Sequence, residues 1–144
     1  MVDLSSERLH ATAVAVDGVA VLIEGPSGAG KSDLALRLID RGAVLISDDQ
    51  TVLVRAGRVL HARAPAEIAG RIEVRGIGIV AMPHVADVPV RLLVRIGGGP
   101  VERMPDREIR RVAGIEVPQM HIEAFHASAP IKVEMVLRGA EVLA

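Results

Sequence analysis

A chain of 144 residues is long enough for one domain with its own hydrophobic core. Its 17 basic and 18 acidic side chains balance to a net charge of −1 without long runs of one sign, which argues against a nucleic-acid surface or a polybasic membrane surface. The absence of cysteine excludes disulfides and thiolate metal sites, and without a signal peptide or a long apolar stretch we expect a cytoplasmic protein that does not contact membranes.

The first predicted strand covers residues 8–16 and is followed by Asp17-Gly18, a pair typical of two-residue hairpin turns. The chain then enters a continuous apolar run, Val19 to Ile23, that is rich in β-branched residues. Such a short run predicts a strand that is buried on both faces. We expect this strand to lead directly into the glycine-rich segment that follows it.

Gly25 to Ser32 (GPSGAGKS) matches the phosphate-loop pattern G-x-x-x-x-G-K-[ST], between a predicted strand and a predicted helix. Glycines let the backbone amides point at one phosphate, Lys31 would hold the β- and γ-phosphates, and the Ser32 hydroxyl would bind Mg²⁺. The alternative is a glycine-rich turn before an ordinary helix. We interpret the segment as a nucleotide site formed by Gly25, Pro26, Ser27, Gly28, Ala29, Gly30, Lys31 and Ser32.

With one Phe and no Trp or Tyr in the chain, we expect aliphatic groups and backbone to contact the adenine.

The helix after the phosphate loop should end near Arg41, with Gly42 as its stop, and Ala43 to Ser47 predicts a further buried strand. Asp48 and Asp49 follow that strand directly. Ligands of open α/β sheets bind at the carboxyl ends of strands, where a carboxylate can hold Mg²⁺ or accept a proton. The pair alone could equally form a solvated turn, but its position after a phosphate loop favours a functional role.

The remainder of the chain predicts mostly strands, so the expected fold is α/β with a mixed, strand-rich sheet and few helices. Residues 104–121 are polar and predict no clear element. The other expected elements are a hairpin over Thr51–Ala64 that turns at Ala56-Gly57, a turn or helical piece over Pro65–Gly70, a glycine-interrupted strand over Ile72–Met82, a strand over Val88–Ile96, and a helix over Ser128–Leu143 with Ser128 as its N-cap.

Two further titratable residues allow both a functional and a structural interpretation. Glu73 lies in an apolar strand with Arg75 two positions on, so the two could form an exposed ion pair, or Glu73 could organise a metal while Arg75 balances its charge. His10 on the first strand could be structural or functional. The spacing of the other histidines indicates no zinc site.

These segments together resemble the catalytic core of the HPr kinase/phosphorylase family. The resemblance rests on His10 before the loop, on the loop GPSGAGKS itself, on LIDRGAVLISDD ending at Asp49, and on IEVRGIGIV beginning at Ile72. Glu102-Arg103-Met104 is a weaker fifth match. The resemblance implies a P-loop kinase core of the kind shared by HPr kinase and PEP carboxykinase, filling residues 1–144 as one catalytic domain without an N-terminal regulatory domain.

The resemblance also implies the reaction, which is transfer of phosphate from ATP, with Mg²⁺, to a serine of the carrier protein HPr, and phosphorolysis as the reverse. The family's residue roles carry over position by position: Asp49 as proton acceptor, Lys31 as phosphate ligand, Ser32 and Glu73 as Mg²⁺ ligands, Arg103 for charge on the transferred group, His10 to orient the reactants, and Asp48, Arg75 and Gly76 in support.

Two departures from the family pattern bear on function. The family's Gly-Arg-Asn element is replaced by His126-Ala127-Ser128, and the helical tail after the late helix is missing. We therefore expect the kinase direction more than phosphorolysis, on HPr or a nitrogen-related paralogue, in a homo-oligomer like the hexamers of long members. Two other functions remain open. The first is an ATP-binding regulatory interaction module with weak turnover. The second is a small-molecule kinase, but the chain lacks the Arg-rich lid insertion expected for such an enzyme.

Overall fold

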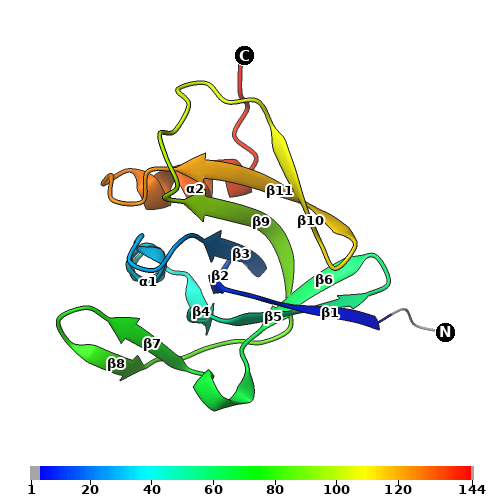
Figure 1. Cartoon of the computed structure of the whole chain (residues 1–144), viewed down its shortest axis with the longest axis vertical. Helices are drawn as coiled ribbons and strands as arrows, with labels where there is room; N and C mark the ends of the chain where they lie inside the picture. Colours follow the sequence, from blue (N-terminus) through cyan, green and yellow to red (C-terminus); the bar gives the residue numbers. More distant parts are fainter. Residues whose placement is uncertain (1–3, 144) are drawn as a thin grey trace.

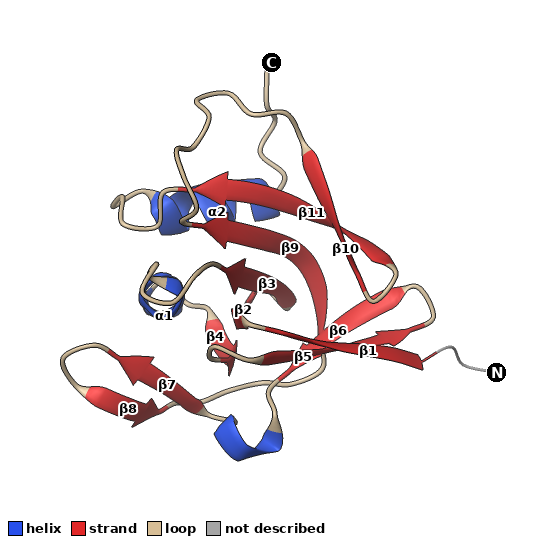
Figure 2. Ribbon diagram, viewed as in Figure 1, coloured by secondary structure: helices blue, strands red, loops and turns tan. Residues whose placement is uncertain are grey.

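The structure is a computed structural model that describes residues 4–143, and strands dominate it (Figures 1 and 2). This composition confirms the expected α/β fold with a strand-rich sheet and few helices. In chain order the elements are β1 (Leu4–Leu9), β2 (Ala11–Val16), β3 (Val19–Glu24), α1 (Lys31–Asp40), β4 (Val44–Ser47), β5 (Thr51–Ala56), β6 (Val59–Arg63), the 3-10 helix η1 (Ala66–Ile68), β7 (Arg71–Val74), β8 (Gly78–Ala81), β9 (Val88–Ile96), β10 (Glu108–Val112), β11 (Ile115–Ile122) and α2 (Ala129–Leu137).

The main sheet runs in the order β1-β5-β6-β9-β3-β2-β4, with β11 paired to β9 and β10 to β11. β3, β9 and β11 are parallel to one another, whereas β2 lies antiparallel between β3 and β4. β4 therefore points the same way as β3. As a result, the carboxyl ends of β3, β4, β9 and β11 and the start of β2 lie at one edge of the sheet, beside α1 (Figure 1).

β3 is buried on both faces, as its apolar run predicts. Val21 and Ile23 belong to a core cluster that includes residues of α1 and α2, whereas Ala20 and Leu22 belong to a second cluster on the other face of the sheet. Full burial of a large aliphatic side chain contributes roughly 1.5–3 kcal/mol. The strand that leads into the phosphate loop is therefore fixed from both sides.

α1 begins inside the phosphate-loop motif and buries Leu34, Ala35 and Leu38 at helical spacing. It ends where the sequence predicts, because Arg41 caps it and Gly42 follows with a φ of +114°, a conformation that favours glycine. The buried stripe holds the helix against the sheet, and its first turn faces the edge where the strands end.

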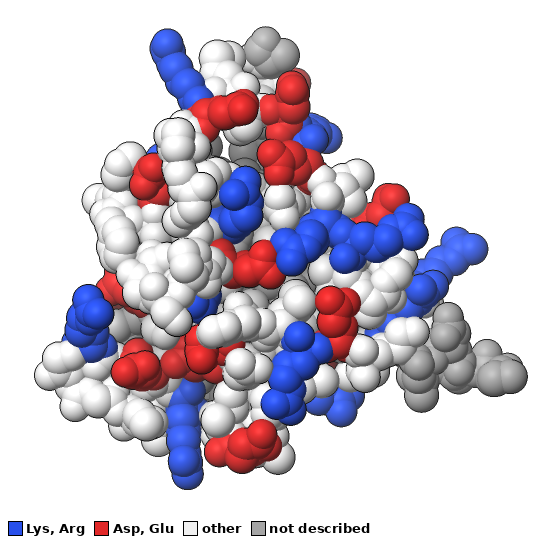
Figure 3. Space-filling view, viewed as in Figure 1, with Lys and Arg blue, Asp and Glu red and all other residues white. Residues whose placement is uncertain are grey.

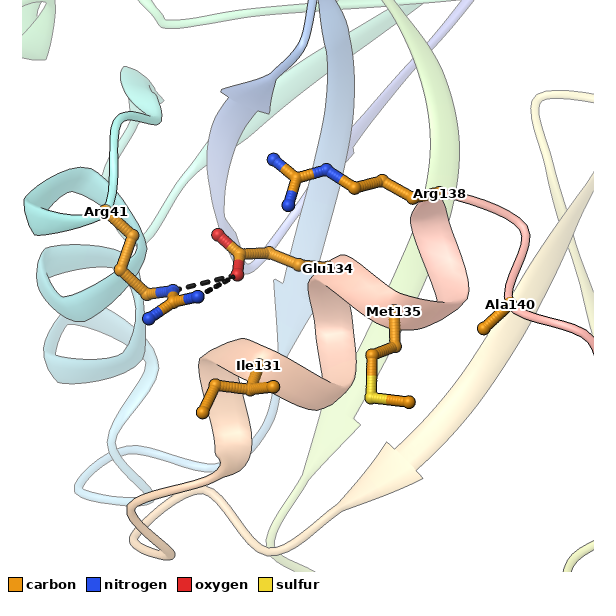
Figure 4. Close-up of a pocket in the computed structure, with 6 residues that line it drawn as sticks. All are labelled: Arg41, Ile131, Glu134, Met135, Arg138 and Ala140. Atoms are coloured by element: carbon orange, nitrogen blue, oxygen red, sulfur yellow. Dashed lines mark hydrogen bonds and ion pairs between the residues drawn. The ribbon is translucent and has the colours of Figure 1, made fainter.

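α2 is shorter than the predicted helix over Ser128–Leu143, because Gly139 takes a φ of +75° and the helix stops at Leu137. Its nearly buried Glu134 accepts a hydrogen bond from Arg41 Nε at 2.8 Å, and this bond raises the pKa of Arg41 above its ordinary value (Figure 4). The pair joins α2 to the end of α1. A surface hollow of about 300 Å³ lies beside it and is lined by none of the residues predicted for the active site.

Two predicted strands are divided in the structure. Residues 8–16 do not form one strand, because the chain bends at His10 and sends β1 to β5 while β2 pairs with β3 and β4. Ile72–Met82 is not one interrupted strand but the hairpin β7–β8, because Gly76 and Gly78 turn the chain with φ values of +89° and +122°.

Residues 104–121, which predict no clear element, contain β10 and most of β11. These strands pair in an antiparallel hairpin whose turn is Ala113-Gly114, with φ values of +47° and +80°. The β5–β6 hairpin, the helical piece after Pro65 and the strand Val88–Ile96 are confirmed.

The surface carries both signs of charge. On the face shown in Figure 3, basic and acidic side chains are interspersed, in line with the net charge of −1. Over residues 4–143, no helix has the length and apolar character needed to cross a bilayer.

Candidate active site

The phosphate loop occupies residues 25–32, between the end of β3 and the first turn of α1, in the strand–loop–helix context that the motif requires. Gly28 and Gly30 have φ values of +81° and +101°, which lets the loop curl around a central point. Lys31 is only 6% exposed, and its Nζ donates hydrogen bonds to the carbonyls of Gly25 at 2.9 Å and Pro26 at 3.4 Å. Two carbonyls at the start of the phosphate loop therefore hold the Lys31 ammonium in place.

Asp48 joins three elements around the loop. It is nearly buried, and its Oδ1 accepts hydrogen bonds from the hydroxyls of Ser32 at 2.6 Å and Thr12 at 3.1 Å. Its Oδ2 accepts a hydrogen bond from the backbone N–H of Glu73 at 2.9 Å. Both oxygens of this carboxylate are therefore engaged in positioning the phosphate-loop helix, β2 and β7 relative to one another.

Asp49 points the other way, because its φ of +66° turns the chain after Asp48. Its side chain is 57% exposed, and its Oδ1 lies 2.6 Å from His10 Nε2 and 4.0 Å from Lys31 Nζ. The structure thus brings His10, Lys31 and Asp49 together, although they are far apart in the sequence. An accessible carboxylate beside a histidine and an ammonium can accept a proton from an incoming hydroxyl.

Thr12 lies beside the phosphate loop, although no sequence motif points to it. Its fully buried hydroxyl donates to Asp48 Oδ1 and accepts a hydrogen bond from the backbone N–H of Asp49 at 3.0 Å. Because β2 runs antiparallel to both of its neighbours, its first residues lie where β3 and β4 end. The available signal was a single hydroxyl in the otherwise apolar stretch ATAVAV.

Glu73 lies in β7 next to Asp48, and its side chain is exposed. Arg75 and Gly76 follow in the turn of the β7–β8 hairpin, so Arg75 does not continue the strand face of Glu73. Within residues 4–143 no ion pair joins Glu73 to Arg75.

Arg103 is exposed in the loop between β9 and β10, and no ion pair or side-chain hydrogen bond ties it to another described residue. Its role stays a prediction.

The oxygen donors near the loop fit Mg²⁺, a hard cation that proteins usually hold with one or two carboxylates together with phosphate oxygens and water. The Ser32 hydroxyl and the backbone N–H of Glu73 donate to different oxygens of Asp48, so Ser32 and the β7 position that carries the Glu73 carboxylate both adjoin this residue. In the described part of the chain, no three acidic, histidine or cysteine side chains gather closely enough to hold a metal by themselves. Phosphate oxygens of a nucleotide, together with water, are the ligands that would join such residues around Mg²⁺.

The fold and the site together define a phosphate-loop domain with a carboxylate–histidine pair beside the loop. The family model described as HPr Serine kinase C-terminal domain matches residues 3–87. The chain belongs to this family.

The curated relatives include an HPr kinase/phosphorylase from Chlorobium limicola, 36% identical over 133 residues that cover 83% of this chain and 40% of that protein. Another, from Mycoplasmopsis pulmonis, is 44% identical over 73 residues, which are 51% of this chain and 24% of that protein. The matched segments therefore make up less than half of each of these relatives. A solved structure of the Hpr(Ser) kinase/phosphatase from Coxiella burnetii matches with a TM-score of 0.80 at 29% identity, covering 92% of this chain and 94% of the other.

Proposed function

We propose that the chain is an ATP-dependent serine kinase that phosphorylates HPr or a nitrogen-related paralogue in the cytoplasm and so regulates a phosphotransferase system. The position of Asp49 carries this proposal, because its carboxylate lies 4.0 Å from the phosphate-loop ammonium and 2.6 Å from His10. Transfer of a γ-phosphoryl group to a hydroxyl needs a base at this place. Relatives named HPr kinase/phosphorylase support the choice of carrier.

Asp49 accepts the proton of the serine hydroxyl as the serine oxygen attacks the γ-phosphorus and the bond from that phosphorus to the bridging oxygen breaks. The exposure of Asp49 supports this role, because the serine arrives on the surface of another protein. His10 orients the carboxylate through its hydrogen bond. Asp48 is a poorer base, because both its oxygens already accept hydrogen bonds.

The loop amides and Lys31 hold the β- and γ-phosphates and neutralise their charge, which together with positioning supplies most of the catalysis of phosphoryl transfer. Ser32 and Glu73 would hold Mg²⁺, which would supply positive charge that neutralises the phosphate oxygens. The same groups would serve phosphorolysis, with Asp49 returning the proton.

The proposal is tested by incubating the chain with γ-labelled ATP, Mg²⁺ and purified HPr or its paralogue. Asp49→Asn should lower transfer by about 10²–10⁴-fold while ATP still binds, because Asn keeps the shape and tolerates the positive φ. Asp87→Asn is the matched control. Asp87 has a φ of +56° and a side chain 58% exposed, but it pairs with Arg63 at the start of β9, the end away from the phosphate loop.

Label on a serine of the carrier that is lost in Asp49→Asn and kept in Asp87→Asn would support the kinase. ATP binding without transfer to either carrier would overturn it and would indicate an ATP-binding regulatory interaction module. If Asp49→Asn still transferred phosphate to the carrier at the unmodified rate, Asp49 would not be the base.

A further inference from the structure

Phe125 is the only Phe, Tyr or Trp of the chain, and the residue is 69% exposed. It lies in the segment of residues 123–128 that joins β11 to α2. Single exposed apolar side chains are common on protein surfaces, so the position of this ring, more than its exposure, bears on its function.

The segment that carries Phe125 is firmly held. Arg37 of α1 donates a hydrogen bond to the carbonyl of Ala124 and another, at 3.1 Å, to the carbonyl of His126. These carbonyls lie immediately before and after Phe125. Arg37 is itself oriented by Asp33, one helical turn earlier, at 3.1 Å. The ring is therefore presented by a fixed backbone rather than by a loose loop.

The ring lies directly against the phosphate loop. A Cβ added to Gly30 would come within 2.9 Å of two ring carbons of Phe125, so the tip of the ring occupies the space that a side chain at position 30 would need. Gly97, at the end of β9, approaches the same loop, because a Cβ there would lie 3.2 Å from Ala29 and Pro26. The ends of β9 and β11 thus form one flank of the phosphate loop.

The other flank of the loop carries the reactive groups. Asp48 and Asp49 follow β4, which lies on the opposite side of β3 from β9 and β11. Figure 1 shows the same division, with β4 on one side of α1 and the β11–α2 connection on the other. A nucleoside triphosphate is linear, with the γ-phosphate at one end and the base at the other. When the γ-phosphate faces Asp49, the base leaves the loop on the Phe125 side.

We propose that Phe125 is a stacking face for the purine base of the bound nucleotide. The proposal rests on the proposed binding of ATP to the phosphate loop and adds the contact that separates a nucleotide from a bare polyphosphate. An aromatic ring stacks on a base through its π-face and needs no hydrogen bond to the base edge.

The first test compares ATP with inorganic tripolyphosphate, which has the phosphates but no base, by calorimetry in the presence of Mg²⁺. Phe125→Ala should weaken ATP binding by about 5- to 100-fold and leave tripolyphosphate binding unchanged. Ile109→Ala is the matched control, because Ile109 is also a large exposed side chain, at 64%, but lies on β10. It should change neither affinity.

The second test uses the absence of Trp and Tyr from the chain. Phe125→Trp retains a stacking ring and introduces a single fluorophore at the proposed contact. Its emission should be quenched when ATP is added and should stay constant when tripolyphosphate is added. ATP affinity should be close to that of the unmodified protein.

Equal weakening of ATP and tripolyphosphate in Phe125→Ala would overturn the proposal, because the ring would then only shape the loop. Unchanged ATP affinity with a raised KM for the carrier would also overturn it and would assign Phe125 to protein docking. If the unmodified protein bound ATP and tripolyphosphate with equal affinity, the stacking proposal would be wrong but the nucleotide site would stand. If it bound neither compound, the proposed nucleotide site would be wrong as well.

Discussion

Asp48 and Asp49 are adjacent in the chain but have different environments. Asp48 is nearly buried and accepts hydrogen bonds on both oxygens, whereas Asp49 is exposed and faces His10 and Lys31. The positive φ of Asp49 turns the two carboxylates apart, and aspartate is among the few residues that tolerate this conformation. One residue can therefore organise the loop while the next meets the substrate.

Thr12→Val tests how Asp48 and Asp49 are held. The substitution keeps the β-branched shape but removes a buried hydroxyl that donates to Asp48 and accepts from the backbone of Asp49. Leaving that buried N–H without its partner should lower the free energy of unfolding by about 1–3 kcal/mol. We expect the rate of carrier phosphorylation to fall by more than the decrease in folded protein would cause, because the backbone of Asp49 loses the hydrogen bond that positions it. Denaturant unfolding and transfer rates at a temperature where both proteins are folded measure the two effects.

Thr12→Ser provides the control, since it restores the hydroxyl and removes only a methyl group. Stability and transfer close to those of the unmodified protein are expected for it. If Thr12→Ser lowered transfer while Thr12→Val left it unchanged, packing of the methyl group would be the cause rather than the hydrogen bonds.

At the scale of elements, prediction from sequence succeeds where local signals and tertiary contacts agree. The apolar run of β3, the phosphate loop, α1 and β9 all follow from periodicity and motif spacing. β10 is polar, and it is held partly by Arg110, which binds both oxygens of Glu24 at 2.7 and 3.0 Å. This contact raises the pKa of Arg110 and joins residues that lie 86 positions apart, so no local pattern reveals it.

The same distinction applies to the active site. The motif predicts Lys31 and Ser32 because their roles depend on positions within one loop. Thr12 joins the site only because β2 runs antiparallel between β3 and β4, a property of the whole sheet. The clamp that Arg37 forms on the segment after β11 likewise depends on where two distant elements meet.

Arg37→Ala tests this clamp. The substitution removes the charged hydrogen bonds that Arg37 makes to two backbone carbonyls next to α2, and we expect the free energy of unfolding to fall by about 1–3 kcal/mol. Amide hydrogen exchange should accelerate in residues 125–128 before it does in β11. Asp33→Ala keeps both carbonyl contacts of Arg37 and removes only the exposed ion pair that helps to orient it, so it should cost less than about 1 kcal/mol. Equal effects of the two substitutions would show that the carbonyl contacts do not hold the segment.

At the scale of the whole molecule, the chain exposes more surface than a compact monomer of its mass. Its accessible surface is 8440 Å² for 15.2 kDa, against about 7,100 Å² expected from the scaling of monomeric proteins. Part of this surface belongs to the β7–β8 hairpin, a separate two-stranded sheet whose Ile77 and Ile79 are 78% and 73% exposed. Ile72 of the same hairpin is buried against the core, so only one face of the hairpin is covered.

We therefore expect the chain to form a homo-oligomer in which a second copy covers Ile77 and Ile79 of this hairpin and leaves Glu73, which pairs with Ile79, accessible. Ile77→Asp combined with Ile79→Asp places two charges on that face, and burying them would be unfavourable. Light scattering coupled to gel filtration, over a wide range of protein concentrations, should show the unmodified chain as an oligomer and the double variant as a monomer with unchanged circular dichroism. Ile109→Asp introduces a charge at another exposed isoleucine, on β10, and should leave the oligomer intact. A chain that stays monomeric at every concentration would contradict the prediction, and dissociation by Ile109→Asp alone would move the interface to β10.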